Sequence, residues 1–240
     1  MKQYWLLLIV LLTNIIQGIT GFAGTALALP LAILVTDLAT AKAILNVLGL
    51  LASIYIFIIS YKNVNYYEFF KMTSGMLLGM AVAKVFLEDT LDEKTLMLIY
   101  ATFVIIISVV LFKFKKGISG NIWIDFTIIF FSGIIHELYV SGGTLLVIYA
   151  INKIEDKKTF RGTLSLLWIV LNSILMIDHA QLGYFTPTTL TLGLETIIPL
   201  AIGIVIGQYL FKRCNQKIFR NLTCGLLMFT GVLMLINNII

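Results

Sequence analysis

Residues 17–25 read QGITGFAGT, and 119 residues later a second polar and glycine-rich stretch, HELYVSGGT, occupies residues 136–144. Each stretch interrupts an apolar segment of about thirty residues, at 4–35 and at 122–151. A duplicated apolar segment with a break near its middle is typical of membrane transporters, in which the paired breaks form the substrate site. These two stretches therefore decide the fold that we expect.

The correspondence continues along the chain on both sides of the breaks. The pairs matched at a spacing of 119 are Gln17 with His136, Gly24 with Gly143, Thr25 with Thr144, Asp37 with Asp156, Thr40 with Thr159, and Lys42 with Arg161. Further on, Gly79 matches Gly203 at a spacing of 124. The sequence therefore predicts two related halves, residues 1–116 and 117–240.

The composition indicates an integral membrane protein. Of the 240 residues, 60% are hydrophobic and 12% are charged, whereas a soluble domain has about 45–50% apolar and about 25% charged residues. The apolar runs are long enough to cross a hydrocarbon layer of about 30 Å. The net charge of +5 lies in short loops, so it predicts membrane topology rather than a nucleic-acid partner.

The two cysteines, Cys214 and Cys224, lack metal-ligand spacing. They predict reduced thiols and no metal site.

The distribution of basic residues predicts the topology, because loops rich in Lys and Arg stay cytoplasmic. The loops that qualify are 61–71, 113–121, 152–161 and 211–220. The loops at 88–94 and 178–187 are then external. Because 113–121 and 152–161 lie on the same side, segment 122–151 must enter and leave the membrane on that side, as a re-entrant hairpin. The repeat predicts the same for segment 4–35, which opens from the outside.

Each half is then a hairpin, with arms of about 10–15 residues, followed by three membrane spans. The predicted spans are 43–60, 70–87 and 95–112 in the first half, and 160–177, 188–210 and 218–238 in the second. Three is odd, so the second half is inverted relative to the first. We expect an all-α integral membrane protein of two inverted repeats, in the cell membrane, with both termini extracytoplasmic. A cleaved signal peptide ending near Ala23 is the alternative for the N-terminus, but that stretch has its counterpart in mid-chain.

The breaks predict an anion site. The glycines allow the chain to turn, and the helix that restarts after each turn presents free N–H groups and a positive dipole end. Two such ends that converge near the bilayer midplane can bind a small anion without a buried cation. The alternative is that the small residues only let helices pack closely. The candidate substrate-binding residues are Gly21, Gly24, Thr25, Gly142, Gly143, Thr144, Ser141, Gln17, Asn46 and Ser165. Ser53 and Asn172 also correspond and are further candidates for the cavity wall.

Three ionisable residues are candidates for coupling or gating. His136 lies within the second break and titrates near neutrality, so it can carry a coupling proton; a neutral, hydrogen-bonded histidine is the alternative. Lys42 and Arg161 lie at opposite mouths in this topology, where each can attract an anion. Asp37 and Asp156 are expected to cap the helices that carry these two basic residues.

The chain resembles the TauE/SafE family of sulfite exporter-like membrane permeases. The resemblance rests on the pattern Gly18-x-x-Gly21-x-x-Gly24-x5-Pro30, on its echo at residues 141–144, and on the segment count over essentially the whole chain. It implies transport of small sulfur-containing anions such as sulfite, sulfoacetate and related sulfonates, or thiosulfate. We therefore expect a secondary transporter that acts as an exporter, with no cofactor.

No Walker motif is present, so an H+ or Na+ gradient is the expected energy source. Two other functions remain open at this point. A passive anion channel would have a continuous wet pore instead of an occluded site. An intramembrane hydrolase would use Ser141 with His136, although no GxSx motif supports that pairing.

Overall fold

A computed structural model describes residues 2–87, 92–113, 121–154 and 156–213, together with residues 232 and 236. These residues form α-helices and contain no β-strand, which confirms the predicted all-α class. The helices are α1 (Lys2–Thr20), α2 (Gly24–Ala32), α3 (Leu38–Ser60), α4 (Tyr66–Phe86), α5 (Glu93–Lys113), α6 (Ile122–Tyr139), α7 (Gly143–Lys153), α8 (Lys157–Gln181) and α9 (Pro187–Arg213). The predicted span 218–238 and the two cysteines lie outside the described residues.

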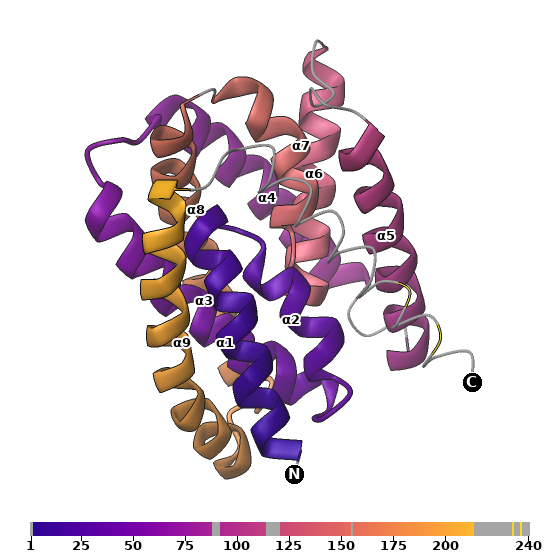
Figure 1. The fold of residues 1–240 in the computed structure, drawn as a ribbon. Helices are drawn as coiled ribbons and strands as arrows, with labels where there is room; N and C mark the ends of the chain where they lie inside the picture. The colour runs from indigo at the N-terminus through magenta and orange to yellow at the C-terminus, as the bar shows by residue number, and fades with distance from the viewer. Residues whose placement is uncertain are drawn as a thin grey trace.

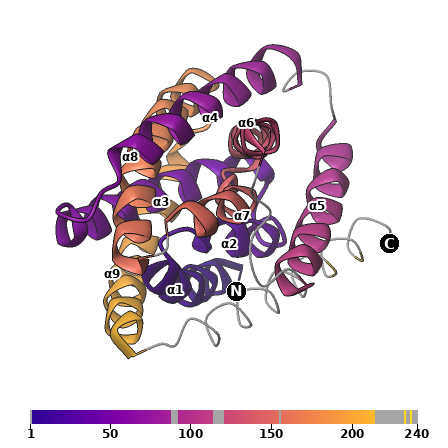
Figure 2. The same cartoon turned by 90° about the horizontal axis from the view of Figure 1, so that it is seen from above.

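Within the part of the chain that the structure describes, six helices are long and apolar enough to cross a membrane: α1, α3, α4, α6, α8 and α9. Figure 2 shows α2, α3 and α7 near the centre of the bundle, with α1, α9, α8 and α4 around them and α5 at the opposite edge. The chain is therefore a multi-pass membrane protein whose short helices, α2 and α7, are interior elements.

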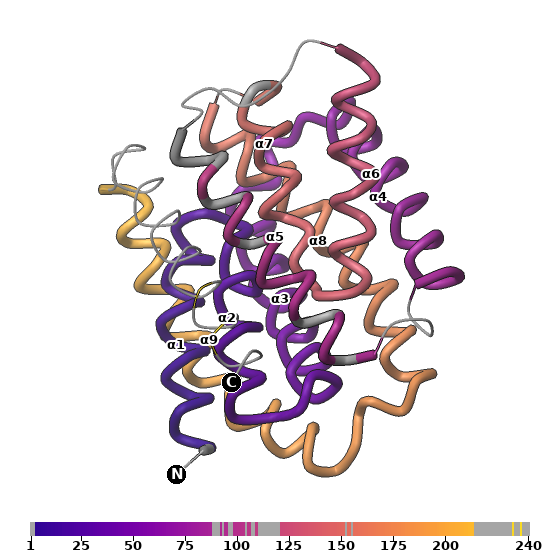
Figure 3. Tube along the Cα trace, turned by 90° about the vertical axis from the view of Figure 1, so that its right-hand side faces the viewer, coloured from indigo at the N-terminus to yellow at the C-terminus, as the bar shows by residue number. Residues whose placement is uncertain are grey.

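Both predicted breaks are present, and each divides its segment into a long and a short helix. The chain reverses at each break, so that α2 runs back beside α1 and α7 beside α6 (Figure 1). The two pairs come in from opposite ends of the bundle (Figure 3). The expected length of about 10–15 residues is wrong for the first arms: α1 has 19 residues and α6 has 18, while α2 has nine and α7 has 11. At 1.5 Å per residue, the first arms reach about 27 Å.

The long arms result from polar side chains that bond to their own helix instead of ending it. Asn14 Nδ2 donates to the carbonyl of Val10 at 2.8 Å, so α1 continues through the polar stretch. It ends at Thr20, and the chain reverses at Gly21, whose φ of +82° is readily accessible only to glycine. The Thr20 hydroxyl accepts from the amides of Phe22 and Ala23, both at 3.0 Å, and so holds the turn.

Glycines set the closest helix contacts. A methyl group added to Gly79 of α4 would come within 2.0 Å of the carbonyl oxygen of Phe130 on α6. One added to Gly203 of α9 would come within 2.7 Å of the carbonyl oxygen of Leu11 on α1. The two helix pairs therefore pack backbone to backbone, and in both the glycine is the one that the sequence comparison matched.

The helices that follow the breaks begin as predicted. Asp37 accepts a hydrogen bond from the amide of Thr40 at 2.8 Å, and Asp156 accepts one from the amide of Thr159 at 2.8 Å. Both aspartates are N-caps with extended backbone conformation. The Thr159 amide, donating to Asp156, is the main cause that lowers the pKa of this carboxyl group below its ordinary value of 3.8. The capping role expected for both residues is confirmed.

Candidate functional site

A small pocket lies where the two breaks meet, between the starts of α2 and α7 and the middles of α3 and α8. Its walls are Gln17, Phe22, Thr25, Gly49, His136, Val140, Gly143, Trp168 and Asn172. Gly49 lies eleven residues from either end of α3, which places the pocket at the mid-depth of a membrane-spanning helix. Residues at the starts of α2 and α7 thus line the same pocket.

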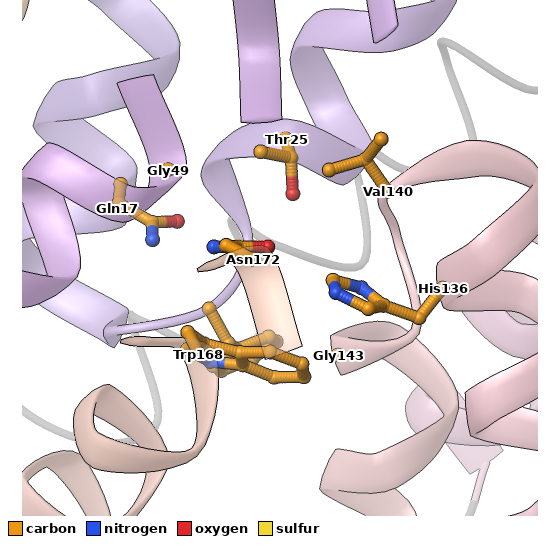
Figure 4. A pocket seen from close by; sticks show the side chains of 9 residues that line it. Gln17, Thr25, Gly49, His136, Val140, Gly143, Trp168 and Asn172 are labelled. Atoms are coloured by element: carbon orange, nitrogen blue, oxygen red, sulfur yellow. The ribbon is translucent and has the colours of Figure 1, made fainter. Parts of the chain in front are cut away.

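The pocket is polar but almost closed. Its free space is about 10 Å³, which is close to the minimum that one water molecule requires. Figure 4 shows the Thr25 hydroxyl, the Asn172 amide and the His136 ring turned toward the same space, with Trp168 beneath them. The His136 and Trp168 ring centroids are 5.3 Å apart. A polyatomic ligand therefore requires the two breaks to move apart.

Several buried polar groups at the pocket have no hydrogen-bond partner among the described residues. They are Trp168 Nε1, both ring nitrogens of His136, and Asn172 Oδ1. The indole nitrogen is a donor only, and a buried donor left without an acceptor costs about 1–3 kcal/mol. No lining residue is acidic. The pocket thus offers Trp168 Nε1 and one nitrogen of a neutral His136 ring as donors to a ligand, beside Asn172 Oδ1, which is an acceptor.

Gly49 and Asn46 hold Asn172 in place from α3. A methyl group added to Gly49 would lie 3.2 Å from Asn172 Nδ2 and 3.4 Å from Thr25 Cγ2, so the missing side chain lets both approach. Asn46 Nδ2 donates to the backbone carbonyl of Asn172 at 3.1 Å. Asn46 therefore supports the pocket from behind rather than lining it.

Fewer backbone amides are free at the start of α2 than the sequence predicted. Gln17 Oε1 accepts from the Gly24 amide at 2.7 Å, so this amide has a partner within the protein. A methyl group at Gly24 would meet Gln17 Cβ at 2.7 Å, which explains the glycine. The amides of Thr25 and Ala26 come before the first intrahelical bond, from Leu27 N to the Ala23 carbonyl, and are the groups left for a ligand.

The structure brings four of the predicted site residues together in the pocket: Gln17, Thr25, His136 and Gly143. The other predicted substrate-binding residues are nearby but outside its wall. Gly21 contacts Arg161 and Gly142 contacts His136, each as part of a break. The hydroxyls of Ser141, Thr144 and Ser165 donate to the carbonyls of Tyr139, Ser141 and Gly162, at 2.8, 3.0 and 2.9 Å.

Lys42 and Arg161, the predicted gating residues, are both buried near helix starts. The Lys42 ammonium lies 5.8 Å from the ring centroid of Tyr184. The Arg161 guanidinium lies 4.5 Å from that of Phe211. Arg161 is only 2% exposed, and its Nε and Nη2 have no hydrogen-bond partner among the described residues. This buried cation lies directly against the turn at Gly21.

Sequence reasoning missed Trp168, because a tryptophan within an apolar span is most simply explained as core or lipid contact. Asn172 was a weaker candidate, found from its match with Ser53. Val140 was also missed, although a valine between Tyr139 and Ser141 in a predicted turn was a usable signal. The left-handed conformation of Val140, with φ of 54° and ψ of 25°, turns the chain into the pocket wall.

Comparison with known proteins agrees with this architecture. Searches of curated proteins and of solved structures found no match. A family model described as Sulfite exporter TauE/SafE matches residues 6–234, nearly the whole chain. This family consists of membrane transporters for sulfur-containing anions. The chain, with its broken helices and multi-pass fold, therefore belongs to the TauE/SafE sulfite exporter family.

Proposed function

We propose that this protein is a secondary exporter of small sulfur-containing anions, such as sulfite, sulfoacetate and related sulfonates, or thiosulfate, bound between the two breaks. The observation that carries the proposal is the set of unpartnered buried groups at the pocket, above all Trp168 Nε1 and the His136 ring. Oxygen-rich anions supply acceptors for these donors. The helix-start amides near Thr25 add a positive potential.

We also propose that the chain consists of two inverted repeats that exchange access between the two membrane faces. Three features support this. The broken helices come in from opposite ends (Figure 3). The packing of α1 on α9 has its counterpart in the packing of α6 on α4, while α3 packs on α8 between them. The contact atoms of Gly79 and Gly203 belong to residues that correspond at the 119-residue spacing, namely Phe130 with Leu11 and Ile134 with Ile15.

The nearly closed pocket favours a carrier over a channel. In a carrier, one ligand is enclosed before the opposite side opens, and a free space of about 10 Å³ fits such a closed conformation. Under the proposed topology, the protein lies in the cell membrane with both termini extracytoplasmic, and an H+ or Na+ gradient supplies the energy. The Ser141 hydroxyl donates to the Tyr139 carbonyl and does not reach His136, so the geometry gives a hydrolase no support.

The test uses purified protein in liposomes loaded with sulfite, sulfoacetate or thiosulfate, with exchange of labelled anion as the readout. We expect exchange of at least one of these anions, and saturation at high concentration. Trp168→Phe removes the indole donor and keeps the ring. It should raise the half-saturating anion concentration roughly tenfold, because a hydrogen bond to a charged group contributes about 1.5–3 kcal/mol.

Trp123→Phe is the matched control, since Trp123 is 75% exposed at the start of α6 and far along that helix from the pocket. It should leave the half-saturating concentration unchanged. Absence of exchange for every anion tested, with correctly folded protein, would contradict the proposed substrate class. An equal effect of both tryptophan substitutions would contradict the proposed site.

A further inference from the structure

A second and larger cavity, of about 390 Å³, lies between the C-terminal parts of α4 and α8, beside the end of α6. Its polar wall consists of Lys84, Glu137, Asp178 and Gln181, and the rest is aliphatic apart from Met80. Carboxylates within membrane-spanning helices face either the protein interior or water. A space of this size with four polar side chains has room and partners for water molecules.

Asp178 is the least satisfied group of this cavity. It is 5% exposed, and its Oδ1 forms an ion pair with Lys84. The other carboxylate oxygen, Oδ2, is buried and has no hydrogen-bond partner among the described residues. Burying a carboxylate oxygen without a partner is costly. A proton taken up from the cavity would remove that cost.

The cavity adjoins the small pocket along α6. His136 lines the pocket while the next residue, Glu137, lines the cavity. On α8, Asp178 lines the cavity while the next residue, His179, is fully buried. Neither ring nitrogen of His179 has a hydrogen-bond partner in the described part of the chain. Neighbouring ionisable residues of α6 thus face the two spaces.

The first half of the chain has no such acid at the matching place. The residue that corresponds to Glu137 at the 119-residue spacing is Gly18, and a methyl group there would come within 2.8 Å of Gly207 Cα. At that position α1 and α9 are in direct backbone contact. Between α6 and α4, the glutamate stands beside the cavity. Glu137 in the second half is therefore not required for the helix packing that the two halves share.

The charges of the wall indicate which ligand the cavity takes. One lysine and two carboxylates give a net negative wall, which disfavours the transported anion. A hard metal cation needs about six oxygen ligands, but among the described residues of this wall only Glu137, Asp178 and Gln181 have side chains that carry oxygen. The Lys84 ammonium on Asp178 would also repel a metal ion. A proton needs a single carboxylate oxygen and fits all these features.

We propose that Asp178 and Glu137 form the protonation site that couples anion transport to the proton gradient, next to the substrate pocket, since Glu137 directly follows His136 on α6. This inference rests on the proposed function. A proton from cavity water binds Asp178, which weakens its ion pair with Lys84 and lets α8 move relative to α4. Since α8 also carries Trp168 and Asn172, that movement reaches the pocket.

The test compares two transport modes in liposomes. One is net anion transport driven by an imposed pH gradient, and the other is anion exchange at equal pH on both sides. Asp178→Asn and Glu137→Gln should reduce the stimulation by the gradient roughly tenfold while changing exchange less than about twofold. Asp178→Glu should restore part of the stimulation, because it keeps the carboxyl group.

Asp125→Asn is the matched control. Asp125 is a buried carboxylate that pairs with Lys153 at 3.0 Å and with Lys71 at 3.7 Å, and it does not line the cavity. It should leave the stimulation unchanged. Unchanged stimulation in both cavity variants, or an equal loss in Asp125→Asn, would overturn the proposal.

An infrared titration of the purified protein separates this inference from the proposed function, because it needs no substrate. The wild type should show the band of a protonated carboxyl group that grows as the pH falls, and Asp178→Asn or Glu137→Gln should remove part of it. If no anion is transported but the band behaves as expected, the substrate class is wrong and the proton site stands. A band that is identical in the wild type and both variants would overturn the proton site itself.

Discussion

Gly21 and Val140, which lie 119 residues apart, both have left-handed backbone conformations, with φ angles of +82° and +54°. Each follows the end of a long helix and reverses the chain toward a short one. Glycine adopts this conformation freely, whereas a β-branched residue is strained in it, by about 1–2 kcal/mol. The second break therefore keeps a strained residue in the wall of the pocket.

Replacing Val140 by glycine should relieve this strain. We expect Val140→Gly to change the free energy of unfolding by less than about 1 kcal/mol, far less than the loss of a buried valine ordinarily costs, because the strain relief offsets the lost burial and the greater freedom of glycine in the unfolded chain. The measurement is thermal unfolding of the detergent-solubilised protein. Gly21→Val should lower the free energy of unfolding, because it adds strain and places Cβ about 3.1 Å from Arg161 Cγ. Equal melting temperatures for all three proteins would contradict the strain.

The close contacts of Gly79 and Gly203 should be indispensable for helix pairing. Gly79→Ala and Gly203→Ala place a methyl group 2.0 and 2.7 Å from backbone carbonyl oxygens, so α4 must move away from α6, or α9 from α1. We expect each to lower the free energy of unfolding by roughly 1–3 kcal/mol, as overpacking does. Gly193→Ala is the control, because its methyl group would meet nothing closer than Ile44 Cγ1 at 4.0 Å. A control as destabilised as the other two would contradict the packing argument.

Three features of this structure could be predicted from the sequence because local chemistry or composition determines them. The helix breaks follow from glycine-rich stretches that were recognisable as a pair. The N-caps at Asp37 and Asp156 follow from an aspartate three residues before a threonine amide, a purely local geometry. The all-α membrane class follows from composition alone. None of these features needs knowledge of distant contacts.

The rest depends on which partners individual side chains select, within a segment or across the bundle, and the sequence pattern does not encode that selection. The length of α1 depends on Asn14 bonding to its own helix in the bundle interior. The occupied Gly24 amide depends on the Gln17 side chain folding back across seven residues. Trp168 lines the pocket only because α8 packs against α3 near Gly49, which lines the same pocket. Asp178 and His179 lie just beyond the predicted span 160–177, and they are buried because α8 extends to Gln181.

Thr25→Val should weaken anion binding while keeping the shape of the side chain. The Thr25 hydroxyl is turned into the pocket (Figure 4), and its loss removes one donor to the anion. We expect the half-saturating anion concentration to rise about fivefold to tenfold, from a hydrogen bond that contributes about 1–1.5 kcal/mol. Thr73→Val is the matched control, since the Thr73 hydroxyl donates to the Phe69 carbonyl at 2.7 Å on α4 and does not line the pocket. The site assignment is wrong if the two variants have the same transport kinetics.

Arg161 should attract the anion on one side of the pocket. Its guanidinium is buried on the Phe211 ring beside the Gly21 turn, with two nitrogens unpartnered. We expect Arg161→Gln to lower the transport rate at low anion concentration roughly tenfold. Arg213→Gln is the matched control, because Arg213 also stacks on an aromatic ring, that of Tyr209, at 4.5 Å. Rates that fall equally in both variants would indicate an effect of net charge and not of position.

The Asp156 cap gives a pH-dependent prediction outside the membrane-spanning region. Its pKa is lowered below 3.8, first by the hydrogen bond from the Thr159 amide and then by that from the Thr159 hydroxyl. A carboxyl group whose pKa is lowered by folding stabilises the folded protein at pH values above its ordinary pKa. This contribution is lost as the pH falls through the pKa of the folded protein. Asp156→Ala should therefore lower the free energy of unfolding by about 1 kcal/mol near neutral pH. When unfolding is measured from neutral pH downward, the difference in the free energy of unfolding between Asp156→Ala and the wild type should narrow only below about pH 4.

Asp156→Asn keeps a capping oxygen that does not titrate, so its stability difference from Asp156→Ala should not change with pH. A difference that narrows already above pH 5 would show that another group is responsible.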